Sequence, residues 1–239
     1  GVDLQFISAV LDCGGLAWMD AISIHPYCYP ASPEDADLVG GVRSVRNLIA
    51  AKGGEHPIWI TEIGWPTHIT QRGVTEQTQA IYLARMYTLL VASGMVETIF
   101  WYDLQDDGTD PNYNEHNFGL VRYDLSPKSG YTALGIISRS LWGITRVTKL
   151  SEGSDGLWHY SFTSPAGPVQ ILWSTGSQLN VTLKAGRYQI TNIYGDSSMV
   201  VTEQGYNLTL TEAPVMIQDL GENGSQPKGG VRVELGANP

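Results

Sequence analysis

The chain has 239 residues and 42% of them are hydrophobic, which is enough for one large domain or two smaller ones with apolar cores. Its formal net charge of −10 argues against nucleic acid and anionic membranes, because binding to phosphates needs clustered Lys and Arg. No stretch approaches the roughly 20 apolar residues that span a bilayer. We therefore expect no nucleic acid or membrane partner, and a polar, uncharged ligand fits the composition.

The first elements alternate between helix and strand. Asp3 is a suitable cap for a helix over residues 3–12, which carry an apolar face. Residues 20–25 predict a short buried strand that ends in His25. A second helix is predicted to start with Pro33 at its first turn, because apolar residues then recur at helical spacing up to residue 53.

A short apolar run at residues 58–61 then leads into Glu62. Its β-branched and aromatic residues lack helical periodicity, which predicts a strand buried on both faces and ended by Gly64. A carboxylate at the end of such a strand lies where α/β folds place their chemistry. The flat rings of Trp59 and Trp65 flank it, and such surfaces bind sugar rings, so a carbohydrate ligand is expected.

The alternation continues to about residue 141. Thr75 starts a predicted helix that ends at Gly94, and residues 96–102 form a third predicted strand. An acidic loop at 103–125 precedes a last helix at 126–141. Three βα units in succession imply a parallel sheet with right-handed crossovers. Residues 1–143 are therefore predicted to be part of a (β/α)8 barrel, roughly a half barrel.

The pattern changes after Gly143 to short alternating runs between Gly, Ser and Asn. This pattern predicts a small antiparallel β-sandwich over residues 144–220. Residues 221–239 are predicted to form a tail or trailing edge. The fold class is thus α/β plus all-β. The predicted strands are 157–162, 169–173, 179–183, 188–193, 199–202, 206–210 and 215–217.

Two further features concern location and cysteines. The sequence begins Gly1-Val2 without Met, so a leader could have been removed or the sequence could start within a longer gene. The compartment is left open, with a secreted or extracytoplasmic one favoured. Cys13 and Cys28 lack metal-ligand spacing, so we expect buried thiols, although a disulfide stays open.

Three motifs together resemble a known family. In chain order, with helices between them, they are similar to the last three βα units of a clan A glycoside hydrolase, and most similar to the family 39-like and family 5-like enzymes. The resemblance covers about residues 4–140. The motifs are Asp20-Ala-Ile-Ser-Ile-His-Pro-Tyr, Trp59-Ile-Thr-Glu-Ile-Gly-Trp and Phe100-Trp-Tyr-Asp-Leu-Gln-Asp-Asp-Gly.

The resemblance implies roles for individual residues in a retaining hydrolase of β-linked glycosides. Glu62 matches the catalytic nucleophile, which forms a glycosyl-enzyme intermediate. His25 and Tyr27 match positions that border the nucleophile and hydrogen-bond to it, and Trp101 matches the aromatic floor of the sugar subsite. The simpler reading of His25 and Trp101 is core packing.

Other candidate substrate-binding residues are less specific. Trp65 is one, and the acidic loop adds Asp106, Asp107, Glu115 and Asn117, whose oxygens could accept hydrogen bonds from sugar hydroxyls. A solvated acidic loop is an equal alternative for these four. A metal site on this loop is a weak rival, because its spacing does not fit a calcium loop. We expect no metal and no cofactor.

One part of the family's pattern has no match. A retaining mechanism needs a second carboxylic acid about 5 Å from the first. In the family this residue follows an Asn at the end of the fourth strand, and the sole Asn-Glu pair here, Asn114-Glu115, follows the last strand instead. The acid/base is therefore expected to be absent from this chain or supplied by a partner. The alternative function is a catalytically inactive barrel fragment or a carbohydrate-binding module.

Three parallel strands cannot close into a barrel. Their open edges and apolar faces would recruit other strands. We therefore expect a homodimer or another homo-oligomer that closes the open edges of the barrel.

Overall fold

The computed structural model describes residues 1–165, 167–221 and 233–235. It divides into two compact units, Gly1–Tyr131 and Thr132–Pro239. Helix α4 (Ser129–Leu141) crosses from the first unit into the second. The domain boundaries drawn from the sequence at residues 143 and 220 stay predictions. None of the described helices is long and apolar enough to cross a bilayer.

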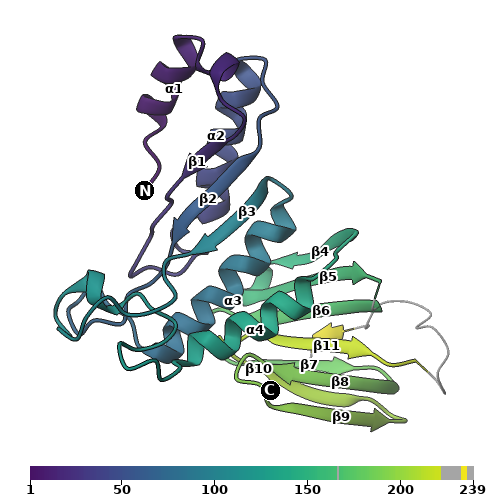
Figure 1. Cartoon of the computed structure of the whole chain (residues 1–239). Coiled ribbons are helices and arrows are strands. Elements are labelled where there is room, and N and C mark those ends of the chain that lie inside the picture. Colours follow the sequence, from purple (N-terminus) through teal and green to yellow (C-terminus); the bar gives the residue numbers. More distant parts are fainter. Residues whose placement is uncertain (166, 222–232, 236–239) are drawn as a thin grey trace. The chain divides into compact units, whose positions relative to one another are not determined.

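The first unit is built around a three-stranded parallel sheet of order β1-β2-β3 (Figure 1). The strands are β1 (Ile22–Ile24), β2 (Ile58–Ile63) and β3 (Val96–Trp101). All three lie where the alternating pattern predicts them, and their parallel pairing is confirmed. Since the carboxyl ends of parallel strands share one edge of the sheet, the residues that follow β1 and β2 come close together.

The helices that lie wholly within this unit are α1 (Leu4–Asp12), η1 (Gly15–Trp18), α2 (Leu38–Ala51), α3 (Glu76–Ser93) and the short η2 (Asn114–Asn117). The predicted caps of α1 and α3 are confirmed, because Asp3 accepts from the amide of Phe6 and Thr75 from that of Thr78. The predicted start of α2 is wrong. Ser32 caps only a turn, and the chain is redirected at Asp37, whose left-handed φ of 46° and side-chain bond to Gly40 begin the helix five residues beyond Pro33.

Within the described part of the first unit, α1, α2 and α3 cover one face of the sheet. Isoleucines of β1 and β2 pack with apolar residues of α1, α2 and α3 in a single core cluster. On the other face Trp59 is 39% and Phe100 51% exposed. The prediction that the 58–61 strand is buried on both faces is therefore wrong for this chain, since Trp59 is exposed on the face that α1, α2 and α3 do not cover.

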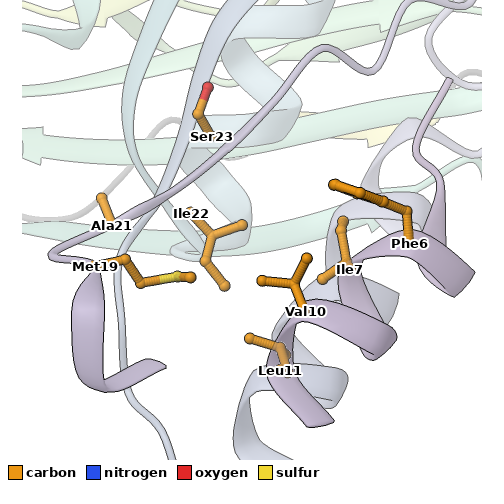
Figure 2. A pocket seen from close by; sticks show the side chains of 8 residues that line it. All are labelled: Phe6, Ile7, Val10, Leu11, Met19, Ala21, Ile22 and Ser23. Carbon is orange, nitrogen blue, oxygen red and sulfur yellow. The ribbon is translucent and has the colours of Figure 1, made fainter. Parts of the chain in front are cut away.

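An apolar pocket of about 200 Å³ lies beside β1. Figure 2 shows that Phe6, Ile7 and Val10 of α1 point toward Met19 and Ile22, whereas the hydroxyl of Ser23 points away from them. The pocket is thus an apolar gap between the first helix and the edge strand.

The second unit is dominated by antiparallel strands (Figure 1). A six-stranded sheet has the order β4-β5-β6-β11-β8-β9, and a three-stranded sheet has the order β10-β7-β12. One apolar cluster draws residues from both sheets, as a sandwich requires. The strands are β4 (Arg146–Glu152), β5 (Leu157–Ser164), β6 (Gly167–Ser174), β7 (Leu179–Leu183), β8 (Gly186–Asn192), β9 (Ser197–Thr202), β10 (Tyr206–Leu210), β11 (Val215–Asp219) and β12 (Val233–Leu235), with a short η3 (Ser154–Gly156) before β5.

All seven predicted strands of this unit are present, and β4 was not predicted. Its polar residues face solvent in most positions, so it lacks the apolar alternation that marks the others. The predicted tail at 221–239 falls mostly outside the described residues. Within it, Val233–Leu235 pairs with β7 at the edge of the smaller sheet.

Both cysteines are free thiols. Cys13 is exposed, so the expectation of a buried thiol is wrong there. Cys28 is partly buried, and burial raises its pKa to about 12.

Candidate active site

Three polar side chains meet at the carboxyl ends of β1 and β2. Glu62, one residue before the end of β2, accepts a hydrogen bond at Oε2 from the hydroxyl of Tyr27 at 3.1 Å. Nδ1 of His25 lies 3.3 Å from the same oxygen. The side chains of His25 and Glu62 are 47% and 39% exposed, so this carboxylate is both held and accessible.

The opposite nitrogen of His25 is also engaged. Nε2 lies 2.8 Å from the hydroxyl oxygen of Thr61, and that oxygen lies 2.5 Å from the hydroxyl of Ser23. Ser23 lies on β1 and His25 directly follows this strand, and the two-residue spacing places both side chains on the same face. The imidazole ring is therefore fixed at both nitrogens, between the nucleophile candidate and a pair of hydroxyl groups.

An aromatic cluster supports Tyr27. Its ring packs edge-on against Tyr29, Tyr102 and Phe118, with centroids 5.8, 6.4 and 5.8 Å away. Burial, followed by the charge of Glu62 and the hydrogen bond to it, raises the pKa of the Tyr27 phenol far above its usual value. Tyr27 therefore stays a hydrogen-bond donor to Glu62 over the whole physiological pH range.

The two candidate tryptophans differ in position. Trp65 is 0% exposed, donates from its indole to the carbonyl of Ala31 at 2.8 Å, and stacks on Trp101. The prediction that Trp65 contacts sugar is thus contradicted, because its ring lies within the core cluster of the first unit. Trp101 at the end of β3 stays partly exposed, and its role as a subsite floor stays a prediction.

The loop after β3 is fixed by a buried ion pair. Lys128 and Asp106 have side chains only 2% and 8% exposed and lie 2.7 Å apart. Lys128 also donates to the hydroxyl of Thr67, and Asp106 accepts from the amide of Gly119. Asp106 therefore acts as the charge partner of buried Lys128, and this engagement does not favour the reading of Asp106 as a sugar ligand.

Asn117 is also committed to the loop. Its amide donates to the carbonyls of Asp110 and Tyr113 at 2.8 and 2.7 Å, so both of its N–H groups are used within the loop itself. This occupation does not favour the predicted contact with sugar. Asp107 is exposed and Glu115 partly exposed. The charge of Glu115 acts on both Tyr27 and Tyr102, so this carboxylate lies toward the Glu62 side of the loop.

Asp103, directly after the β3 strand and Tyr102, is an unusual carboxylic acid. Burial and the nearby charges of Asp107 and Asp106 raise its pKa to about 7. Its Oδ1 atom is buried and makes no hydrogen bond within the described part of the chain. A protonated side chain suits this environment better than a charged one.

Sequence reasoning missed Thr61, Ser23 and Asp103. Ser23 carries a signal, since strand alternation predicts that a hydroxyl two residues before His25 faces the same side. For Thr61, directly before Glu62, alternation predicts the opposite face, and the pairing of β2 with β3 is irregular between Ile60 and Ile63, where both residues lie. The pKa of Asp103 carries none, because it depends on burial that only the folded loop creates. No group of three or more His, Cys, Asp or Glu side chains is placed to hold a metal ion among the described residues.

Comparison with known proteins places this site in context. The chain is similar to a family 39 glycoside hydrolase from Bacteroides cellulosilyticus WH2, with 27% identity and a TM-score of 0.71 over 89% of this chain and 46% of that one. It also shares its fold with a glucosidase from Croceicoccus marinus, at 14% identity and a TM-score of 0.63 over 89% and 56% of the two chains. A family 30 endoxylanase from Clostridium papyrosolvens C71 matches at 12% identity and a TM-score of 0.52, over 84% and 49%.

The chain thus spans about half the length of these solved structures. A search of curated proteins finds no match. Residues 4–124 match the family described as glycosyl hydrolase catalytic core, and this segment holds all of the Glu62 site described above. With a match over half of its residues, the chain belongs to the glycosyl hydrolase catalytic core family.

Proposed function

We propose that the chain carries the nucleophile half of a retaining glycoside hydrolase that acts on β-linked glycosides, with Glu62 as the nucleophile. The observation that carries this proposal is the fixed carboxylate at the end of β2, held by Tyr27 and His25 while 39% of its side chain is exposed. The family match and the likeness to a family 39 glycoside hydrolase support it.

The chemistry follows from that arrangement. An oxygen of Glu62 attacks the anomeric carbon as the bond to the leaving oxygen breaks, which forms a glycosyl ester. The leaving oxygen takes a proton from an acid. The conjugate base of that acid then removes a proton from water, which attacks the same carbon and releases Glu62. The Tyr27 hydroxyl keeps the attacking carboxylate in one orientation, so less order must be gained in the transition state.

We propose that the acid/base lies outside this chain. Glu115 is the second residue of the Asn114-Glu115 pair, the sole Asn-Glu pair in the sequence. It lies in the short helix η2 (Asn114–Asn117) and accepts a hydrogen bond from the side-chain amide of Asn114. It is not at the end of a barrel strand, where the family places its acid. A partner copy or another part of a complete barrel would supply the missing carboxyl group.

Trapping of the intermediate tests the assignment of Glu62. A 2-deoxy-2-fluoro-β-glycosyl fluoride has a leaving group that needs no acid, so it can label a nucleophile even where the acid/base is missing. We expect mass spectrometry to find one added sugar on the peptide that contains Glu62, with gluco- and xylo-configured reagents tried in parallel. Glu62→Gln should abolish labelling and the matched Glu115→Gln should retain it.

Label on another residue would overturn the assignment of Glu62. No label with any reagent would favour the alternative, an inactive barrel fragment or a carbohydrate-binding module. The exposed rings of Trp59 and Phe100 favour that alternative as a specific observation, because such rings can contact sugars without any catalysis.

A further inference from the structure

A chain of four side chains ends at the candidate nucleophile. Ser23 contacts Thr61, Thr61 contacts Nε2 of His25, and Nδ1 of His25 faces Oε2 of Glu62, at 2.5, 2.8 and 3.3 Å. The residues come from two paired strands, since Ser23 lies opposite Trp59 in the register of β1 and β2. These contacts are thus a product of the strand pairing: Ser23 lies on β1, Thr61 and Glu62 lie on β2, and His25 directly follows β1.

The number of protons fixes the direction of these contacts. A hydroxyl group has one proton to donate, and a neutral imidazole has one donor and one acceptor nitrogen. If Nδ1 were the unprotonated nitrogen, its lone pair would face the lone pairs of an ionised Glu62, which is repulsive. With the proton on Nδ1, Nε2 is an acceptor, so Thr61 must donate to it and Ser23 must donate to Thr61.

We propose that Thr61 and Ser23 are positioning residues that hold neutral His25 in its Nδ1–H tautomer, with that N–H directed at Glu62. A histidine side chain in water favours the Nε2–H tautomer, so the opposite form needs a donor at Nε2, and Thr61 supplies one. Thr61 is partly buried, whereas Ser23 is exposed. Water can replace Ser23 more easily than Thr61, and Thr61 has the larger effect.

The consequence for catalysis rests on the proposed function. When Glu62 becomes an ester it loses its negative charge, and the Nδ1–H then faces the ester oxygen, which is the leaving group of the second step. A hydrogen bond there stabilises the charge that returns to this oxygen as the ester breaks. Loss of Thr61 should therefore lower the rate of deglycosylation more than it raises KM.

Nuclear magnetic resonance tests the tautomer without any turnover. A long-range ¹H–¹⁵N spectrum at about pH 8.5, above the ordinary pKa of histidine, separates protonated from unprotonated ring nitrogens. The chain has five histidines, and His25→Gln identifies the signals of His25. We expect the Nδ1–H form in the wild type. Thr61→Val should change the tautomer ratio by about fivefold toward Nε2–H, the effect of one ordinary hydrogen bond.

The variants separate this role from simple packing. Thr61→Ser keeps the hydroxyl and should restore the wild-type spectrum, and Ser23→Ala should shift the ratio less than Thr61→Val. Thr98→Val is the matched control, because Thr98 lies opposite Trp59 on β3 and makes no side-chain hydrogen bond within the described chain; it should change nothing.

An Nε2–H tautomer in the wild type overturns the proposal, even where Thr61→Val fails to fold. The same conclusion follows if Thr61→Val and Thr61→Ser give the same tautomer ratio. Neither result touches the trapping experiment, so failure of this inference is distinct from failure of the Glu62 assignment.

Discussion

The pKa of Tyr27 depends on the charge of Glu62. Its phenol donates to Glu62, and burial first, then the Glu62 charge and the hydrogen bond to it, raise its pKa. Glu62→Gln removes the charge but keeps an acceptor of the same shape. We expect the pKa of Tyr27 to fall in this variant yet stay above the ordinary value, because burial remains. Titration of ¹³C-labelled tyrosine by nuclear magnetic resonance measures it.

Glu115→Gln is the control for this titration. The charge of Glu115 raises the pKa of Tyr27 less than the charge of Glu62 does, so its neutralisation should move that pKa less than neutralisation of Glu62. An equal effect of the two variants would show that Tyr27 responds to the general acidity of the loop rather than to the candidate nucleophile.

The raised pKa of Asp103 leads us to predict that the stability of the chain depends on pH. Its folded pKa is raised to about 7 from an unfolded value near 3.8, so the folded state holds a proton that the unfolded state has lost between these pH values. The free energy of unfolding therefore falls as pH rises through this window. Asp103→Asn should become more stable relative to the wild type by roughly 1–2 kcal/mol between pH 5 and pH 8, a value reduced for the partial exposure of the side chain.

Urea unfolding of both proteins at each pH measures this difference. The comparison cancels titrating groups that lie far from Asp103, whereas Asp106 and Asp107 do not cancel, because their charges act on Asp103. If the stability difference between Asp103→Asn and the wild type were the same at both pH values, Asp103 would have an ordinary pKa.

At the scale of elements, the turn after β2 depends on a glycine. A Cβ atom on Gly64 would lie 2.0 Å from the carbonyl oxygen of Tyr102, at the end of β3. Backbone cannot yield as a flexible side chain can, so we expect Gly64→Ala to destabilise the chain by about 1–3 kcal/mol and to displace the strand end that carries Glu62. Urea unfolding midpoints measure the loss.

Gly41 is the matched glycine within α2. No atom lies within 4 Å of the position that its Cβ would occupy, and alanine is the better helix former. Gly41→Ala should therefore stabilise the chain by about 0.5–1 kcal/mol. The prediction for Gly64 would be refuted if Gly64→Ala left the stability unchanged or raised it as Gly41→Ala does, since the close approach to Tyr102 would then cost nothing.

Local signals in the sequence predicted most helix caps and strands correctly, but they did not predict features that depend on contacts between distant residues. The caps Asp3 and Thr75 are correct because a cap depends on residues within one turn of itself. The predicted start of α2 is incorrect, because Ser32-Pro33 and Asp37 are both suitable helix starts. Only the folded chain decides between them. The polar edge strand β4 was missed for a related reason: its pairing with β5, not its own pattern, makes it a strand.

The candidate site shows the same division. Glu62, His25 and Tyr27 could be placed together because parallel strands bring their carboxyl ends to one edge. Trp65 could not be placed, since the direction of a side chain after a strand depends on the turn at Gly64. Asp106 looked like a loop acid, and its role became clear only with Lys128, which lies far along the sequence.

At the scale of the whole molecule, the uncovered face of the first unit's sheet raises a question of assembly. Trp59 and Phe100 are exposed on it, and β1 pairs on one side only. Exposed apolar faces and strand edges favour association. The net charge of −10 opposes the approach of two copies, and salt screens that repulsion.

We therefore predict that this chain forms a homodimer whose population rises with ionic strength. Light scattering over a range of protein and salt concentrations measures it. Trp59→Lys combined with Phe100→Lys should weaken association by at least tenfold, since about 1.4 kcal/mol of lost apolar contact is enough for that change. Trp142→Lys is the control, because Trp142 is 82% exposed in the second unit and lies outside the sheet. A monomer at every concentration would contradict this prediction and would mean that water alone covers the exposed face of the sheet. The proposed external acid/base would then have to come from another part of a complete barrel rather than from a second copy.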